Sequence, residues 1–214
     1  MNKWICGAVV ALAGGTAQAA VSEQRWIDAA SQAVAFGQQH GLAITLRVES
    51  GDGLPGHTPI GLQSENGQCT LVVSARDNPS ADRLAGLIEP ELVDLFLAGA
   101  AVHEVGHCYR RLHGYPHNEK LLPFAERITF VRNWFNRRVR TEEAFADMAE
   151  SVWLARNHPE RYDAVMAEIQ KVREDFLEPK HDTLAWLARA RADGPVDAGG
   201  SLFDAAEKRL AAVR

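Results

Sequence analysis

Hydrophobic residues recur along this chain at two spacings, and the two spacings predict different elements. Apolar residues three and four apart predict a helix over 22–39. Strict alternation predicts half-buried strands over 42–49 and 68–75. Asn66-Gly67 is a hairpin turn signal, and 60–63 reads as a short strand before it. Helical spacing then returns over 81–88, 90–112, 141–156, 159–177, 182–192 and 201–212. This order predicts an α+β fold, with a small, mostly antiparallel sheet packed against a predominantly helical body.

One segment, 121–140, mixes aromatic residues with arginines. The aromatic residues are Phe124, Phe130, Trp134 and Phe135, and the arginines are Arg127, Arg132, Arg137, Arg138 and Arg140. We interpret the aromatic residues as core and the arginines as a solvated face. Thr141 then reads as the N-cap of the next helix, because Thr is a favoured N-cap residue.

The helix predicted over 90–112 carries the motif His103-Glu104-Val105-Gly106-His107 directly after an apolar run. Residues four apart share a helix face, so His103 and His107 can point at one tetrahedral Zn²⁺. Glu104 lies one step around the helix, where it can act as the general base toward a zinc-activated water. The alternative is a helix with two surface histidines. The apolar flanks disfavour that alternative, because burying these groups is costly unless they are paired or bind a metal.

A catalytic zinc has three protein ligands and one open position, so a third ligand is required. Glu143 and Asp147 lie four residues apart in Glu143-Ala-Phe-Ala-Asp147 and share a face of the helix predicted there. We expect Glu143 to bind the metal and Asp147 to accept the N–H of a ligand histidine, most simply His103. Glu142 and Glu150 are weaker rivals for the same role.

His113 is a competing third ligand, since it stands where a metzincin has its third histidine. That pattern needs glycine three residues after the second histidine, and Arg110 stands there instead. A continuing helix carries His113 about 15 Å along the axis from His103, at about 1.5 Å per residue. We therefore expect His113 to lie away from the metal.

With the H-E-x-x-H motif and the downstream E-x-x-x-D, the chain resembles the gluzincin zinc metallopeptidases over about residues 100–150. The E-x-x-A-D form of the second motif also looks like the CaaX-processing and heat-shock membrane peptidases, but their membrane spans are missing here. The resemblance implies a compact zincin-like domain with His103, His107 and Glu143 as zinc ligands. It also implies Glu104 as base, and a sheet edge, for which 68–75 is the candidate, holding an extended substrate.

The implied reaction is peptide-bond hydrolysis on a peptide or protein substrate, and its oxyanion needs a further donor. The downstream candidates are His181, Tyr109, Tyr115 and Tyr162. We favour His181 as a catalytic residue, because it lies in a loop just before a predicted helix. Other interpretations are an exported zinc-dependent cell-wall amidase, a non-catalytic binding module on a zincin fold, and a structural zinc protein.

Composition narrows these classes. Hydrophobic residues make up 46% and charged residues 24% of 214 residues, as in an ordinary single globular domain. The net charge of -5 disfavours nucleic-acid binding. The first 19 residues combine Lys3, a short apolar run and Ala17-Gln18-Ala19, which is typical of a signal peptide. We expect the domain to span 20–214 and to be periplasmic or secreted, without stable membrane insertion, and the sequence leaves its oligomeric state open.

The positions of the cysteines are relevant to the predicted export. Beyond the predicted signal peptide the chain has Cys69 and Cys108. An exported protein meets oxidising conditions, so the two can form a bridge that ties a strand to the motif helix. The alternative is two separate buried thiols.

Overall fold

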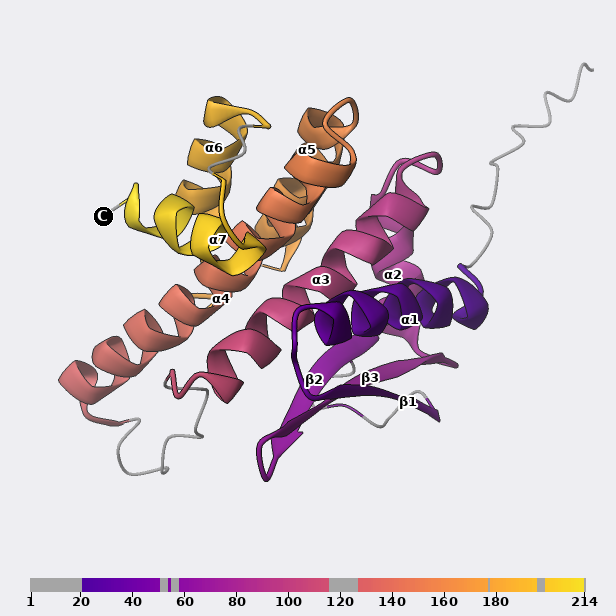
Figure 1. Cartoon of the computed structure of the whole chain (residues 1–214), viewed down its shortest axis with the longest axis horizontal. Helices are drawn as coiled ribbons and strands as arrows, with labels where there is room; N and C mark the ends of the chain where they lie inside the picture. The colour runs from indigo at the N-terminus through magenta and orange to yellow at the C-terminus, as the bar shows by residue number, and fades with distance from the viewer. Residues whose placement is uncertain are drawn as a thin grey trace, which may run out of the picture.

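The computed structural model describes residues 21–50, 54, 58–115, 127–176, 178–195 and 199–213. Within these residues, three strands and seven helices follow in the order α1 (Glu23–Gln39), β1 (Ile44–Ser50), β2 (Ile60–Glu65), β3 (Gln68–Arg76), α2 (Pro79–Leu87), α3 (Val93–Leu112), α4 (Thr129–Asn157), α5 (Tyr162–Asp175), α6 (Leu184–Asp193) and α7 (Leu202–Ala211). The sheet packs on α1 and α3, and α3 packs on α4 (Figure 1). Helices α6 and α7 also pack on α4, and α5 contacts α2, α3, α4 and α6. The α+β class is as predicted.

The sheet is mixed, which corrects the prediction of a mostly antiparallel one. Its order is β1-β3-β2, with β3 parallel to β1 and antiparallel to β2. The predicted hairpin at Asn66-Gly67 forms, and both residues have positive φ. That hairpin returns β3 between the two earlier strands. The segment 68–75 is therefore the central strand and cannot supply a sheet edge, while β1 and β2 are the edge strands. Alternation reveals which face a strand buries, but not which strands are its neighbours.

Two close contacts with neighbouring elements hold the motif helix α3 in place. A Cβ built on Gly106 would lie 3.1 Å from the Cα of Ala146 and 3.2 Å from the Cβ of Ala149, so glycine here lets α3 and α4 approach closely. Cys69 and Cys108 form a disulfide with a Cα–Cα distance of 5.9 Å. The bridge joins central strand β3 to α3 immediately after His107, so the motif is tied to both neighbouring layers.

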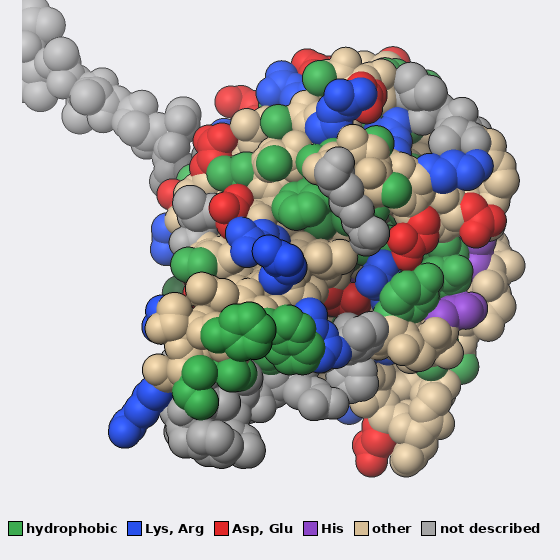
Figure 2. All heavy atoms as spheres, turned by 90° about the vertical axis from the view of Figure 1, so that its left-hand side faces the viewer, with side chains coloured by type: hydrophobic (Ala, Val, Ile, Leu, Met, Phe, Trp, Pro, Cys, Tyr) green, Lys and Arg blue, Asp and Glu red, His purple; other side chains and the backbone are tan. Residues whose placement is uncertain are grey.

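Helix α4 corrects two further expectations. It runs without a break from Thr129, so Thr141 is not an N-cap; its hydroxyl donates to the Arg137 carbonyl inside the helix. No glycine or proline interrupts 129–157, and the helix therefore continues through the expected boundary. Its first turns carry Phe130 and Trp134, which are 79% and 48% exposed and are not core. Figure 2 faces the end of the molecule where α4 begins and shows a hydrophobic patch bordered by basic side chains.

Helix α3 starts at Val93, three residues later than the predicted Pro90. The predicted signal peptide, 1–19, lies outside the described residues. Within those residues no helix is both long and apolar enough to cross a membrane.

Candidate metal centre

Helices α3 and α4 bring three ligand atoms together from distant parts of the sequence. The Nε2 atoms of His103 and His107 lie 3.1 Å apart. Oε2 of Glu143 lies 3.5 Å from Nε2 of His103, and Oε1 of the same carboxylate lies 3.6 Å from Nε2 of His107. All three side chains are buried, and they form one of the described groups able to hold a cation. The pairing expected from sequence, two histidines on one helix and a glutamate on the next, is present.

These separations can be compared with those that zinc imposes. Zinc binds imidazole nitrogen and carboxylate oxygen at about 2.0–2.1 Å in tetrahedral geometry, which places ligand atoms roughly 3.3–3.4 Å from one another. The observed separations of 3.1, 3.5 and 3.6 Å bracket that value. The donor set, two imidazoles and one carboxylate, is also that of a catalytic rather than a closed structural zinc site. The residues therefore fit zinc.

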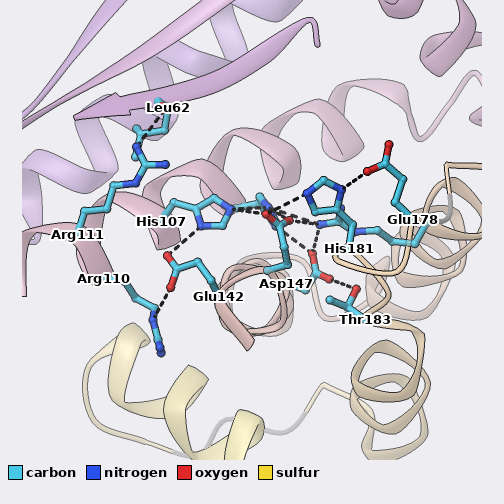
Figure 3. Close-up of polar contacts among 12 residues, drawn as sticks. Leu62, His107, Arg110, Arg111, Glu142, Asp147, Glu178, His181 and Thr183 are labelled. Carbon is cyan, nitrogen blue, oxygen red and sulfur yellow. Dashed lines mark hydrogen bonds and ion pairs between the residues drawn. The ribbon is translucent and has the colours of Figure 1, made fainter. Parts of the chain in front are cut away.

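Each histidine has its other ring nitrogen beside a carboxylate of α4. Nδ1 of His103 lies 2.9 Å from Oδ1 of Asp147. Nδ1 of His107 lies 3.2 Å from Oε1 of Glu142, as Figure 3 shows. Such contacts fix the ring orientation and the tautomer that presents Nε2 to a metal. Asp147 thus lies where we expected it, whereas Glu142 is not a rival ligand but the corresponding partner of His107.

Both carboxylates are held in turn. Asp147 accepts hydrogen bonds from the Thr183 hydroxyl and, at 2.6 Å, from Nη2 of Arg173 (Figure 3 labels Asp147 and Thr183). Glu142 pairs with Nε of Arg110 at 2.9 Å. Each imidazole therefore belongs to a chain of histidine, carboxylate and arginine, and the orientation of each ring is fixed by residues outside the motif.

Electrostatics at the site favour a positive charge between the imidazoles and Glu143. Burial disfavours the charged form of His103, but its contacts with Asp147 and Glu143 outweigh burial and raise its pKa to about 10. Burial likewise opposes ionisation of Glu143, yet His107, His103 and Arg173 hold its pKa well below the ordinary value. Arg173 and His103 lower the pKa of Asp147 to about 2 despite burial. A metal cation can supply that positive charge in place of a proton.

A cleft of about 790 Å³ opens onto the three ligands. Its walls come from the start of β2, from α2, α3, α4 and α5, and from the loop before α6. Glu104 and His181 both line it. Nε2 of His181 is 3.8 Å from Oε1 of Glu143, and its Nδ1 is 3.6 Å from Glu178 (Figure 3). Burial lowers the pKa of His181, so the neutral imidazole prevails at neutral pH.

The competing residues lie elsewhere. His113 caps the end of α3, where Nδ1 contacts the Tyr109 carbonyl at 2.8 Å, and it does not reach the site. Tyr109 stacks on Phe203, and Tyr115 lies under the Arg110 guanidinium. The hydroxyl of Tyr162 donates to the Ala190 carbonyl away from the cleft.

Sequence reasoning missed Arg173, Arg110 and Thr183. Arg173 comes from α5, and its Nη2 is 3.5 Å from both Oε2 of Glu143 and Nε2 of His103. The sequence did hold a signal for the role of Glu142 as the partner of His107. Glu142 stands directly before Glu143, and two adjacent carboxylates after an H-E-x-x-H motif can serve two different imidazoles. No pattern around Arg173 or Thr183 indicates that either contacts α4.

Comparisons of the chain with protein-family models, with curated proteins and with solved structures find no match.

Proposed function

We propose that this protein is an exported zinc-dependent metallopeptidase with a zincin-like domain of the gluzincin type. One observation carries the proposal. The Nε2 atoms of His103 and His107 lie at zinc-ligand separations from each other and each from one oxygen of the Glu143 carboxylate, and the glutamate of the same motif lines the cleft that opens onto them. The orientation of both imidazoles by carboxylates supports a metal site over a chance cluster.

His103, His107 and Glu143 would hold the zinc. Bound there, zinc would lower the pKa of a water and polarise the carbonyl of the scissile bond. Glu104 follows His103 on α3 and lines the cleft, and in this proposal it would take the proton and return it to the leaving amine. His181 lines the same cleft and would donate to the oxyanion as a neutral imidazole. Asp147 and Glu142 hold the ligand rings.

The substrate would lie beside edge strand β2. Pro59, Ile60 and Gly61 at its start line the cleft, so an extended peptide can pair with this end of the strand. Further along, Nη1 of Arg111 donates to the Leu62 carbonyl at 3.1 Å. Pairing with substrate would therefore be confined to the end of β2 that borders the metal ligands.

The test is zinc content by elemental analysis alongside cleavage of a peptide library. We expect about one zinc per chain and measurable cleavage by the wild-type protein. Glu104→Gln should keep zinc and lose about 10²- to 10⁴-fold in turnover, the usual contribution of a general base. Glu168→Gln is the matched control, because Glu168 is a buried glutamate on α5 that does not line the cleft.

Wild-type turnover in Glu104→Gln would exclude Glu104 as the base. Hydrolysis of purified peptidoglycan without cleavage of any protein or library peptide would assign the protein to the cell-wall amidases instead.

A further inference from the structure

Glu150 is a buried carboxylate to which the proposed reaction gives no role. It follows Glu143 and Asp147 on the same face of α4 and is 3% exposed. Oε1 is enclosed and has no hydrogen-bond partner among the residues that the structure describes. Burial raises the pKa of Glu150 to about 8. Leaving such a group unpartnered costs free energy, so its position calls for a ligand that completes it.

The fold makes room for this carboxylate rather than merely tolerating it. Gly99 of α3 faces Glu150, and a methyl group added at Gly99 would collide with Oε1 of Glu150. Any larger residue at position 99 would therefore displace the carboxylate. The absence of a side chain at Gly99 is what allows Glu150 to lie between α3 and α4.

Glu150 is also reached from the cleft and lies close to the reacting centre. It is one of the residues that line the cleft. One of its oxygens lies within 4.8 Å of ligand atoms of both His103 and Asp147. The lining of the same cleft includes the apolar residues Leu84, Phe96, Ala100, Ile169 and Val172. A substrate bound at the metal can therefore place one of its own groups against Glu150 in apolar surroundings.

The charged residues of the cleft indicate which kind of substrate group would contact Glu150. Six carboxylates line the cleft (Glu104, Glu143, Asp147, Glu150, Asp175 and Glu178), against the two cations Arg173 and Lys180. Arg173 pairs with Asp147, Lys180 with Glu178, and Asp175 with Arg83. Glu143 and Glu104 are the proposed ligand and base. Glu150 alone has neither an ion-pair partner among the described residues nor a role in the proposed reaction; His103 and Arg173 influence its charge without pairing with it.

We propose that Glu150 is a specificity residue that binds a protonated primary amine of the substrate, supplied by its free N-terminus or by a lysine next to the scissile bond. The proposal rests on the peptidase function proposed above. A charge-assisted hydrogen bond inside apolar walls discriminates strongly against an uncharged group of the same size. The amine would give Glu150 the direct hydrogen-bonded cation that it lacks among the described residues.

The experiment measures kcat/KM of the zinc-loaded protein on matched peptide pairs. One pair differs only in a free or acetylated N-terminus, and the other has lysine or norleucine beside the scissile bond. The wild-type protein should prefer the amine in at least one pair by about 10- to 100-fold, the range for a hydrogen bond to a charged group. Preference in the first pair assigns the N-terminus, and preference in the second assigns lysine.

Three variants complete the design. Glu150→Gln should reduce the preference ratio to near one, and Glu168→Gln should leave it as in the wild type. Gly99→Ala keeps the charge but displaces the carboxylate, so it should also lower the ratio; circular dichroism establishes that it is folded.

The failures of the two proposals are distinguishable. Cleavage without amine preference, or a preference that persists in Glu150→Gln, overturns the amine site and leaves the peptidase intact. A zinc-loaded protein that cleaves no peptide of either pair or of the library overturns the peptidase and the amine site together.

Discussion

The two histidines of the motif have similar partners but different surroundings. On one side His103, Asp147 and Arg173 form a chain that borders the cleft. On the other, His107, Glu142 and Arg110 form a chain that ends on Glu207 of α7, 2.8 Å from Arg110. The Arg173 side chain is 22% exposed and lies near two ligand atoms, whereas Arg110 is buried under α7.

The difference separates two tasks. His107 lines the cleft, but Glu142 and Arg110 behind it do not, so these two residues can only fix the ring and stabilise the packing of α3, α4 and α7. The His103 chain shares the cleft with the substrate, and Arg173 lies 3.5 Å from Glu143 Oε2, so this chain can also act on the reaction. The following predictions test that division.

The largest expected effect is the loss of zinc binding when either histidine is replaced, and here His103 and His107 should behave alike. His103→Ala and His107→Ala each remove a zinc ligand, and both should lower zinc affinity by more than about 100-fold, beyond the 10- to 100-fold effect of an outer partner. Both should also lower the unfolding temperature of the zinc-loaded protein, because binding contributes to folding. His113→Ala is the control. Competition with a chromophoric chelator measures the affinities, and unchanged binding in either variant would refute the site.

Replacing Asp147 and replacing Glu142 should lower the stability of the protein by different amounts. Asp147→Asn and Glu142→Gln should each reduce zinc affinity about 10- to 100-fold. Asp147→Asn should also lower the free energy of unfolding by about 3 kcal/mol, because it breaks a buried pair with Arg173. Glu142→Gln should cost less, since Arg110 keeps Glu207. Urea unfolding without metal tests this, and equal losses in the two variants would contradict the asymmetry.

The two arginines should differ in turnover. Arg173→Met should lower kcat/KM about tenfold even at saturating zinc, because it removes a cation beside Glu143. Arg110→Met should weaken zinc binding and stability, and saturating zinc should restore its turnover. Steady-state kinetics across a zinc titration distinguishes the two, and full restoration of Arg173→Met would leave Arg173 with only a structural role.

The smallest expected effect is the pH dependence of stability that comes from Glu150, which lies on the His103 side of the site. The pKa of Glu150 is raised to about 8 from 4.5, so the folded protein holds a proton there that the unfolded chain releases between these values. Its contribution to stability is complete below pH 4.5 and is lost as pH rises through 8. His103, Glu104, Asp147 and Arg173 are the charged groups that influence it.

From pH 7 to pH 9 this loss should amount to about 1 kcal/mol. Glu150→Gln does not titrate and should lack that part of the decline in urea unfolding. Parallel pH profiles for the two proteins would show that Glu150 does not hold the proton.

The part of the site that could be predicted from sequence is the part that local helical spacing determines. His103, Glu104 and His107 are set by one helical turn, and Glu143 and Asp147 by another, so their shared faces follow from the sequence. The positions of Arg173 and Thr183 depend on where α5 and α6 pack against α4, which no local pattern encodes. The same holds for β3, whose alternation fixed its buried face but not its central place in the sheet.

Helix α4 illustrates a second limit. Thr141 is a good N-cap residue, but the helix passes through it because nothing before it breaks the chain. The aromatic residues of its first turns are apolar in type, yet Phe130 is exposed and no described element packs over it. Residue type set the expectation in both cases, and tertiary context decided the outcome.

The central claim is that His103, His107 and Glu143 converge on one cation, and the most direct measurement is a crystal structure of the zinc-loaded protein with anomalous data at the zinc edge. The account predicts a single zinc about 2.0–2.1 Å from Nε2 of both histidines and about 2.0–2.2 Å from a Glu143 oxygen. A zinc bound elsewhere, or bound to the two histidines with Glu143 out of reach, would contradict it.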